Sequence, residues 1–260
     1  MPFTPAHPAA ILPLPRLMRR HGVPSALVIG SLAPDLAYFL PLNVPRTSSH
    51  SLLGLFWFCI PIGIVAYLLF HLLLKHPLLN LLPDPLQRRA VHYADGNGLP
   101  AVHWTSVVVS LFVGACTHLA WDAFTHDNAP GVVALPFLRM DLFSIGNYHV
   151  YAYRVLQHSS SALGLLALSL WILFWFRAAN PAAVSLAGLT DGERRITYVS
   201  LLVIPALSGL IAVFWSLSLP FTMKGIENAV GEAVVSIFST FGLGLILFAI
   251  WWRLVPGRRL

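Results

Sequence analysis

The sequence predicts an all-α membrane protein: a bundle of about five transmembrane helices, preceded by an N-terminal helical segment that is re-entrant or interfacial. Of its 260 residues, 57% are hydrophobic and only 10% are charged, and the mean hydropathy is +0.74. A soluble domain carries about 25% charged residues. A larger soluble core does not explain the low share of charged residues in this chain, because such a domain would still have a surface in contact with water. Five apolar runs also have roughly the 20 residues that are needed to cross a bilayer.

Each of these runs is long and nearly free of charge, and we place them at about 51–74, 104–124, 160–176, 198–219 and 233–254. Pro61 and Pro205 fall inside the first and fourth runs, where proline is expected to kink a helix. The length indicates one integral domain over residues 1–260, with an N-terminal segment 1–50 and a five-span bundle 51–254. Lys and Arg divide almost equally between the two sides, so the positive-inside rule leaves the orientation open.

The N-terminal segment contains a shorter apolar stretch, SALVIGSLAPDLAYFLPL (25–42), which Pro34 and Asp35 interrupt. That length favours a re-entrant or interfacial helix over a spanning helix. Basic residues precede the stretch, but an Asp lies in its middle and no small-residue cleavage site follows. We therefore expect the segment to be retained rather than cleaved as a signal peptide.

The stretches between the runs are predicted to be polar loops, at 75–103, 127–157 and 178–196. In the last of these, Thr190 or Asp191 is suited to cap a short helix. The net charge of +6 is expected to lie in loops that face anionic head groups, so the lipid bilayer is the expected partner. No basic cluster lies on a soluble module, which argues against nucleic-acid binding. The oligomeric state is left open.

The second run ends in GACTHLAWDAFTH (114–126), which places His118, Asp122 and His126 at intervals of four residues. Residues four apart lie on nearly the same face of a helix and drift by about 40° at each step. Ionisable groups within a span cost several kcal/mol each unless they are paired or hydrated. We therefore expect this row to face the bundle interior, a water-filled pocket or a metal ion.

The spacing of the row favours a metal site. The two histidines lie about 12 Å apart along the axis, whereas a central carboxylate can bridge two ions about 3.5–4 Å apart. A two-metal site bridged by Asp122 therefore fits, and a single site that uses one histidine is the alternative. If the first two spans are antiparallel, His50 lies at the same membrane face as His126, and the N-terminal segment leads into it. The expected ligands of a divalent metal, Zn²⁺ with Mn²⁺ or Fe as alternatives, are His7, Asp35, His50, His118, Asp122 and His126.

The alternative for each of these residues is a structural role, because buried His and Asp side chains also pair with each other. His149 and His158 lie on the same side of the membrane as the row, and either could add a ligand or a proton donor.

Four motifs carry a resemblance to a known family: PFTPAHPAA, GSLAPDLAYF, HSLLG and GACTHLAWDAFTH. Over nearly the whole chain and in this order, they resemble the uncharacterised bacterial membrane family DUF4184. The resemblance implies a multi-pass protein of the bacterial inner (cytoplasmic) membrane, and it implies no established activity.

A more distant likeness concerns the order of the polar residues. The order His, Asp, His, then His-x-x-x-Asp is similar to the metal-ligand order of zinc-dependent phospholipase C and related membrane-bound metal-dependent hydrolases. The matching positions are His7, Asp35, His50, His118 and Asp122, with His126 as a further candidate. The chain departs from the phospholipase pattern because His149 is followed four residues later by Tyr153 rather than Glu. The likeness therefore implies one or two metal ions rather than three.

Three functions follow as hypotheses. The first is a membrane-embedded metal-dependent hydrolase that acts on a lipid-like or phosphoester substrate, with His149 or His158 protonating the leaving group. The second is a transporter or ion-handling protein, because intramembrane His and Asp also form ion paths. The third is a structural partner in which the row packs the spans together.

Overall fold

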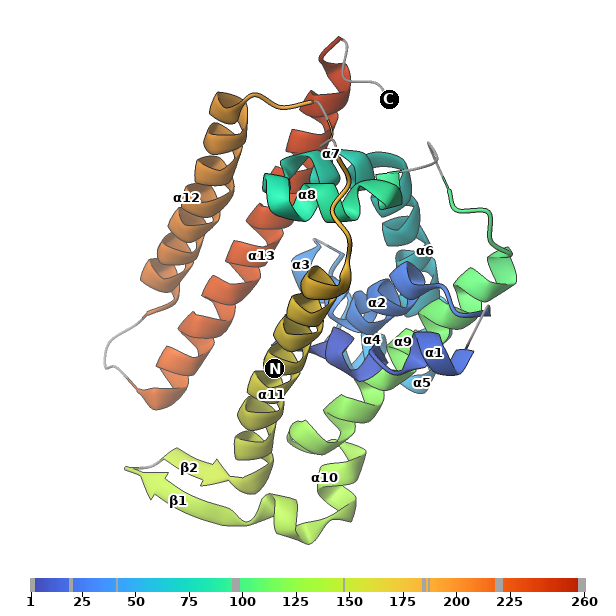
Figure 1. Cartoon of the computed structure of the whole chain (residues 1–260). Helices are drawn as coiled ribbons and strands as arrows, with labels where there is room; N and C mark the ends of the chain where they lie inside the picture. The colour runs from blue at the N-terminus through green and yellow to red at the C-terminus, as the bar shows by residue number, and fades with distance from the viewer. Residues whose placement is uncertain are drawn as a thin grey trace. The chain divides into compact units, whose positions relative to one another are not determined.

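Five helices in the structure, a computed structural model of the chain, are long and apolar enough to cross a membrane (Figure 1). They are Leu52–Leu81, Trp104–Thr125, Ala152–Ala178, Asp191–Ser216 and Met223–Leu254. The structure describes residues 3–18, 21–40, 42–94, 99–146, 148–183, 186, 188–217 and 222–256. The all-α membrane class is confirmed, and the chain is a multi-pass membrane protein by the length and composition of its helices. The expected end of the fourth span, at 219, lies outside the described residues.

The chain forms two compact units, and the first contains Met1–Tyr67 and Ala101–Trp175. Its N-terminal part is a series of short helical elements: η1 (Thr4–Ile11), α1 (Leu14–Met18), α2 (Pro24–Leu32), η3 (Ala33–Asp35), α3 (Leu36–Phe39) and α4 (Arg46–Ser49). The first part of the first span follows as α5 (Leu52–Gly54), η4 (Leu55–Cys59) and α6 (Ile60–Leu69), which the unit includes as far as Tyr67. The rest of the unit comprises α9 (Trp104–Thr125), α10 (Pro130–Ala134), η7 (Pro136–Arg139), β1 (Asp141–Ile145), β2 (Tyr148–Tyr151) and α11 (Ala152–Ala178), which the unit includes as far as Trp175.

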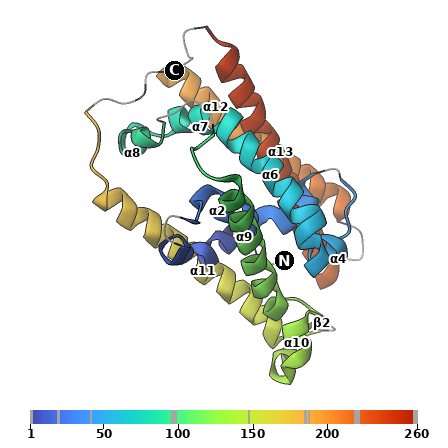
Figure 2. The same cartoon turned by 90° about the vertical axis from the view of Figure 1, so that its right-hand side faces the viewer.

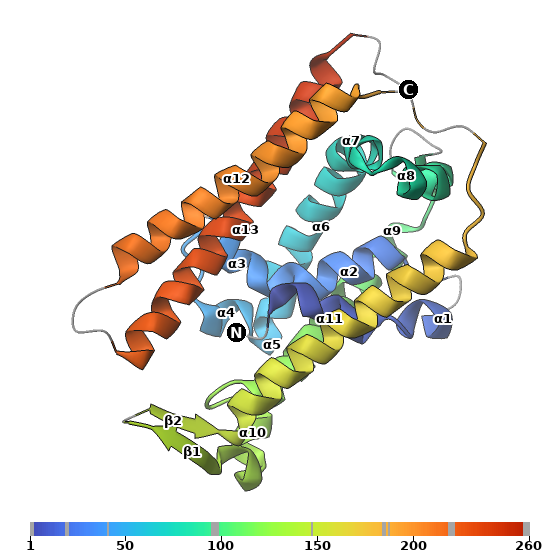
Figure 3. The ribbon, with the colours of Figure 1, turned by 60° about the vertical axis from the view of Figure 1, so that its left-hand side comes forward.

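The second unit contains Leu68–Pro100 and Phe176–Leu260. Its elements are η5 (Phe70–Leu74), α7 (Lys75–Leu81), α8 (Asp84–Ala90), η6 (Val91–Ala94), α12 (Asp191–Ser216) and α13 (Met223–Leu254). Figures 1 and 3 show α12 and α13 lying side by side as a helical pair. Thr190 caps α12 through a capping box, because its hydroxyl accepts from the Glu193 N–H and the Glu193 carboxylate accepts from the Thr190 N–H. The cap therefore starts the fourth span rather than a separate short helix.

The predicted polar loop at 127–157 contains more regular structure than we expected. Strands β1 and β2 pair antiparallel, with Gly146 at φ +60° between them, and α11 begins at Ala152 rather than near residue 160. Val, Ile, Phe and Tyr at these positions favour strands, but two short strands with an exposed apolar face give no hydropathy signal of their own. The predicted loop at 75–103 likewise begins with the helical residues of α7 and α8.

The first span widens just before its proline. Residues Leu55–Cys59 form a π-helical turn in which the Ile60 N–H donates to the Leu55 carbonyl. Pro61 follows directly and has no N–H to donate, so a shifted hydrogen-bond register precedes it. The π-helical turn therefore accommodates Pro61, at the position where we expected a kink.

Helix α2 lies beside the middle of the second span, α9 (Figure 2), and two hydrogen bonds show that it runs in the same direction. The Val23 N–H donates to the Ser110 hydroxyl at 3.0 Å, and the Ser31 carbonyl lies 2.8 Å from His118 Nδ1. Both pairs are separated by 87 residues, which shows that the two helices keep a constant register. A helix at the depth of the middle of a span fits the re-entrant expectation better than the interfacial one.

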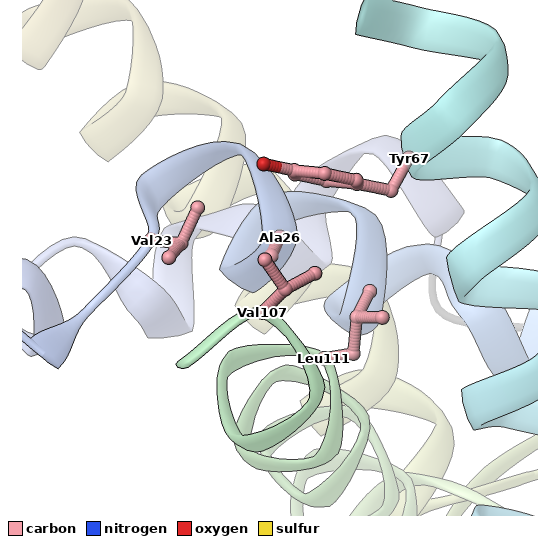
Figure 4. Packing of buried hydrophobic residues seen from close by; sticks show 5 residues of the cluster. All are labelled: Val23, Ala26, Tyr67, Val107 and Leu111. Carbon is pink, nitrogen blue, oxygen red and sulfur yellow. The ribbon is translucent and has the colours of Figure 1, made fainter. Parts of the chain in front are cut away.

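Two glycines allow this close approach of α2 and α9. A Cβ at Gly30 would lie 2.2 Å from the Leu111 carbonyl oxygen, and a Cβ at Gly114 would lie 2.3 Å from the Leu27 carbonyl oxygen. Small residues at such crossings let helix backbones meet in membranes. A cluster of buried side chains extends the contact toward the first span (Figure 4): Val23, Ala26, Tyr67, Val107 and Leu111.

We expect Gly114→Ala to destabilise the protein by about 1–3 kcal/mol, because the new methyl group meets backbone atoms that cannot move aside. Thermal unfolding in detergent would measure this loss. Gly242→Ala is the matched control, since a Cβ there meets nothing within 4 Å. Equal melting temperatures for the two variants would contradict the close crossing.

Candidate metal centre

Asp122 lies at the centre of a buried polar cluster at the end of α9. Its two carboxylate oxygens face different histidines. Oδ1 lies 3.7 Å from His7 Nε2 and 3.4 Å from His126 Nδ1. Oδ2 lies 3.6 Å from His50 Nε2 and 3.7 Å from His118 Nε2. Four imidazoles thus surround one buried carboxylate.

Asp35 provides a second buried carboxylate on the other side of these imidazoles. Its Oδ1 lies 3.2 Å from His50 Nε2 and 3.6 Å from His118 Nε2, and its Oδ2 accepts a 2.6 Å hydrogen bond from the Thr4 hydroxyl. Burial works to raise the pKa of Asp35, but the hydrogen bond with His50 and the nearby His118 outweigh it and hold the pKa below its usual range. Asp35 is therefore ionised near neutral pH. The register of α2 on α9 explains its position, because Asp35 and Asp122 are also 87 residues apart.

His118 is fully buried and its tautomer follows from its surroundings. Nδ1 lies 2.8 Å from the Ser31 carbonyl oxygen, which can only accept, so Nδ1 carries the proton. Nε2 then presents a lone pair to oxygens of Asp35 and Asp122, and no hydrogen-bond partner for it is found among the described residues. A lone pair and two carboxylate oxygens repel one another at these distances, so a proton or a cation is needed between them.

His7 reaches the cluster from η1, and its ring stacks on His118 with centroids 3.7 Å apart and planes inclined by 16°. Within the described part of the chain, neither ring nitrogen of His7 has a hydrogen-bond partner. Burial lowers the pKa of His7 to about 3, and burial lowers the pKa of His126, just beyond the end of α9, to about 4. Both imidazoles are therefore neutral near pH 7 and have a lone pair available.

These separations match the geometry of a metal shell. Two groups have ligand atoms that all lie within 4.8 Å of one another: His7, Asp35 and His118, and His50, His118 and Asp122. Metal–ligand bonds of about 2.0–2.2 Å at tetrahedral angles place neighbouring ligand atoms about 3.4 Å apart. The N···O distances of 3.2–3.7 Å in the cluster bracket that value. These buried His and Asp groups could therefore hold a metal ion.

Arg46, the first residue of α4, is part of the cluster and was not expected from the sequence. Its Nη2 donates a 2.8 Å hydrogen bond to Asp122 Oδ2, and its side chain is 37% exposed. One guanidinium against the carboxylates of Asp35 and Asp122 leaves a net charge of −1, which a protonated histidine or a cation must balance. Arg46 precedes His50 by four residues in RTSSH, and this proximity in sequence was the available signal.

Further polar residues that we did not anticipate orient the cluster: Thr4, Ser31 and Ser49. The Ser49 hydroxyl lies 2.9 Å from His50 Nδ1 and 3.3 Å from the Arg46 carbonyl oxygen. Because the ionised Asp35 carboxylate can only accept, Nε2 of His50 donates to it, and a cation that displaces this proton would meet a lone pair directed at the carboxylates.

A cleft of about 720 Å³ opens beside the cluster, at the start of the first span and the end of the second. Arg46, His50 and Asp122 belong to its polar part, and Leu52 and Leu119 belong to its apolar part. A molecule in this cleft would therefore touch both the buried charges and side chains at a membrane face.

The two predicted proton donors lie elsewhere in the first unit. His149 is half-exposed on β2, and its imidazole is hydrogen bonded to Asp141 on β1. His158 is exposed on α11. Among the described residues, no hydrogen bond or ion pair connects either of them to the cluster, so their role stays a prediction. By contrast, the structure brings all six predicted ligands together.

The fold and the cluster define a multi-pass helical membrane protein with buried His and Asp groups that could hold a metal ion. The chain belongs to the DUF4184 family, described as a domain of unknown function, whose model matches residues 1–250. No curated protein and no solved structure matches the chain.

The lowered pKa of His7 makes stability depend on pH. The unfolded chain binds a proton at this residue below about pH 6.5, whereas the folded protein does so only near pH 3. The stability that neutral His7 contributes is therefore fully present above about pH 6.5, and it is lost as the pH drops toward 3. In the presence of a chelator, we expect the melting temperature to fall less between pH 7.5 and pH 4.5 for His7→Asn than for the wild type.

Asp35 is present in both the wild type and His7→Asn. The effect of its titration on the melting temperature is therefore common to both proteins and cancels when they are compared. Exposed His158 supplies a control, and His158→Asn should follow the wild type. An equal loss for wild type and His7→Asn would contradict the assignment of a buried, neutral His7.

Proposed function

We propose that this protein is a membrane-embedded metal-dependent hydrolase that acts on a lipid-like or phosphoester substrate. The observation that supports it most strongly is the convergence of two buried carboxylates and several imidazole nitrogens at ligand-to-ligand distances, next to a cleft. A purely structural cluster has no need of an adjoining cleft or of imidazole nitrogens without hydrogen-bond partners.

The residues that would hold a divalent ion are the six of the cluster, and Zn²⁺ fits their nitrogen and oxygen donors, with Mn²⁺ or Fe as alternatives. Asp122 is suited to bridge two ions, because Oδ1 faces His7 and His126 while Oδ2 faces His50 and His118. The central carboxylate is thus placed between two sets of histidines, as a two-metal site requires.

When bound, such an ion supplies Lewis acidity, which polarises a phosphoryl or carbonyl oxygen and makes water a nucleophile at neutral pH. The chain's own residues hold the donors for this chemistry. The Ser31 carbonyl fixes the tautomer of His118, and the Thr4 hydroxyl holds Asp35. Such outer contacts orient ligands and raise their basicity.

We also propose the bacterial inner membrane as the location. The five apolar helices and the likeness to a bacterial membrane family support this proposal. A centre near the ends of two spans is accessible to the head groups and ester bonds of lipids, and this placement is the reason to propose a lipid-like substrate.

Metal analysis of the purified protein tests the proposal. After incubation with Zn²⁺ or Mn²⁺ and desalting, we expect the wild type to retain metal, while His118→Ala and Asp122→Ala each lose at least about tenfold in metal affinity. Mass spectrometry of the metals and a phosphoester hydrolysis assay are the measurements. His103→Ala, an exposed residue at the opposite end of α9, is the control.

The Arg46–Asp122 ion pair favours the structural alternative, because it compensates one buried charge without any metal. Under that alternative, His118→Ala lowers the melting temperature while the metal content of the wild type is already negligible. A wild type that retains no metal would therefore overturn the proposed hydrolase.

A further inference from the structure

We propose that the cleft beside the cluster binds an amphiphile with a phosphoryl head group, which Arg46 recognises while Leu52 and Leu119 contact its apolar chain. This inference rests on the proposed function, because it names the substrate class of that same site. It assigns to Arg46 a role in substrate specificity rather than in holding metal.

The guanidinium of Arg46 is available to a ligand in the cleft. It carries five N–H donors, of which Nη2 donates to Asp122, and the hydroxyl of Tyr38 also lies close to the guanidinium. The side chain lines the cleft and is 37% exposed, so it can present further donors there. A planar guanidinium matches the oxygens of a phosphoryl group, which it can contact with two parallel hydrogen bonds.

The apolar part of the cleft fits an acyl or alkyl chain. Leu52 begins the first span and is 78% exposed, and Leu119, on α9, also lines the cleft. Exposed leucines at the end of a span are covered by lipid chains in a bilayer, so the cleft opens toward that environment. A ligand with one charged end and one apolar end satisfies both parts of the lining.

Charge determines the order in which ligands bind. Asp122 and Asp127 line the cleft with Arg46, and Asp35 lies deeper, so three carboxylates oppose one guanidinium. An anion is repelled from this site unless a cation is present. A cation on Asp122 Oδ2 also repels the guanidinium that already contacts this oxygen. A phosphoryl group that draws Arg46 into the cleft relieves this repulsion, so metal and anion should strengthen each other's binding reciprocally.

Binding of non-hydrolysable probes tests the inference. Dodecylphosphonate and dodecanol share one chain and differ in the anionic group, and methylphosphonate supplies the head group alone. With Mn²⁺ bound, we expect the wild type in nanodiscs to bind dodecylphosphonate at least about tenfold more tightly than either of the others, a difference of about 1.4 kcal/mol. We expect Arg46→Gln to lose the preference over dodecanol and Arg46→Lys to keep part of it.

Two further variants separate the parts of the cleft. Leu119→Trp should weaken both dodecyl probes by filling the apolar part, while Arg16→Gln, on an exposed arginine of the same unit, should change neither. Tighter Mn²⁺ binding in the presence of dodecylphosphonate is expected for the wild type and should be smaller in Arg46→Gln.

The outcomes distinguish this inference from the proposed function. If the wild type retains metal but binds dodecylphosphonate and dodecanol equally, or if Arg46→Gln keeps the full preference, the inference is wrong and the metal site stands. If methylphosphonate binds as tightly as dodecylphosphonate, the apolar part takes no chain and the ligand is a free phosphate compound. If no metal is retained, the proposed function fails first and the inference fails with it.

Discussion

The burial of Asp122 within a membrane-spanning helix is the constraint on which the rest of the first unit depends. An isolated carboxylate at this position would cost several kcal/mol, so it must be surrounded by groups that can balance its charge. The chain meets this requirement from several distant segments, since His7, His50 and Arg46 all precede Asp122 by more than 70 residues. Their side chains meet around one carboxylate, and that meeting fixes where each segment lies.

The short N-terminal helices gain a clear role from this arrangement. Helix α2 is too short to cross a membrane, yet it is held along the second span by hydrogen bonds near both of its ends and by a close backbone approach at Gly30 and Gly114. The helical turn after it carries Asp35 to the level of Asp122. The N-terminal segment thus supplies a charged group to the end of the second span, and polar groups near both ends of its helix are satisfied against that span.

Much of this organisation was predictable from the sequence because its signals are large. A low content of charged residues and runs of about 20 apolar residues identify the spans, and His and Asp at intervals of four inside a span identify the cluster. Arg46 was missed despite its place four residues before His50, because an arginine before a span is equally typical of a contact with head groups. The Ser31 carbonyl was not predictable, since any residue offers one. The hairpin β1–β2 was missed because its pairing depends on a turn and a bulge rather than on hydropathy.

The constant register between α2 and α9 restricts how relatives of this chain can change in length. One residue added inside either helix would turn everything beyond it by about 100° and shift it by about 1.5 Å along the axis. An insertion between Gly114 and Asp122 would therefore carry the carboxylate away from its partners on the N-terminal helices. The connection between the first two spans lies outside both helices, so it can lengthen or shorten without this effect. Length variation among homologues should accordingly accumulate in that connection and be excluded from the two paired helices.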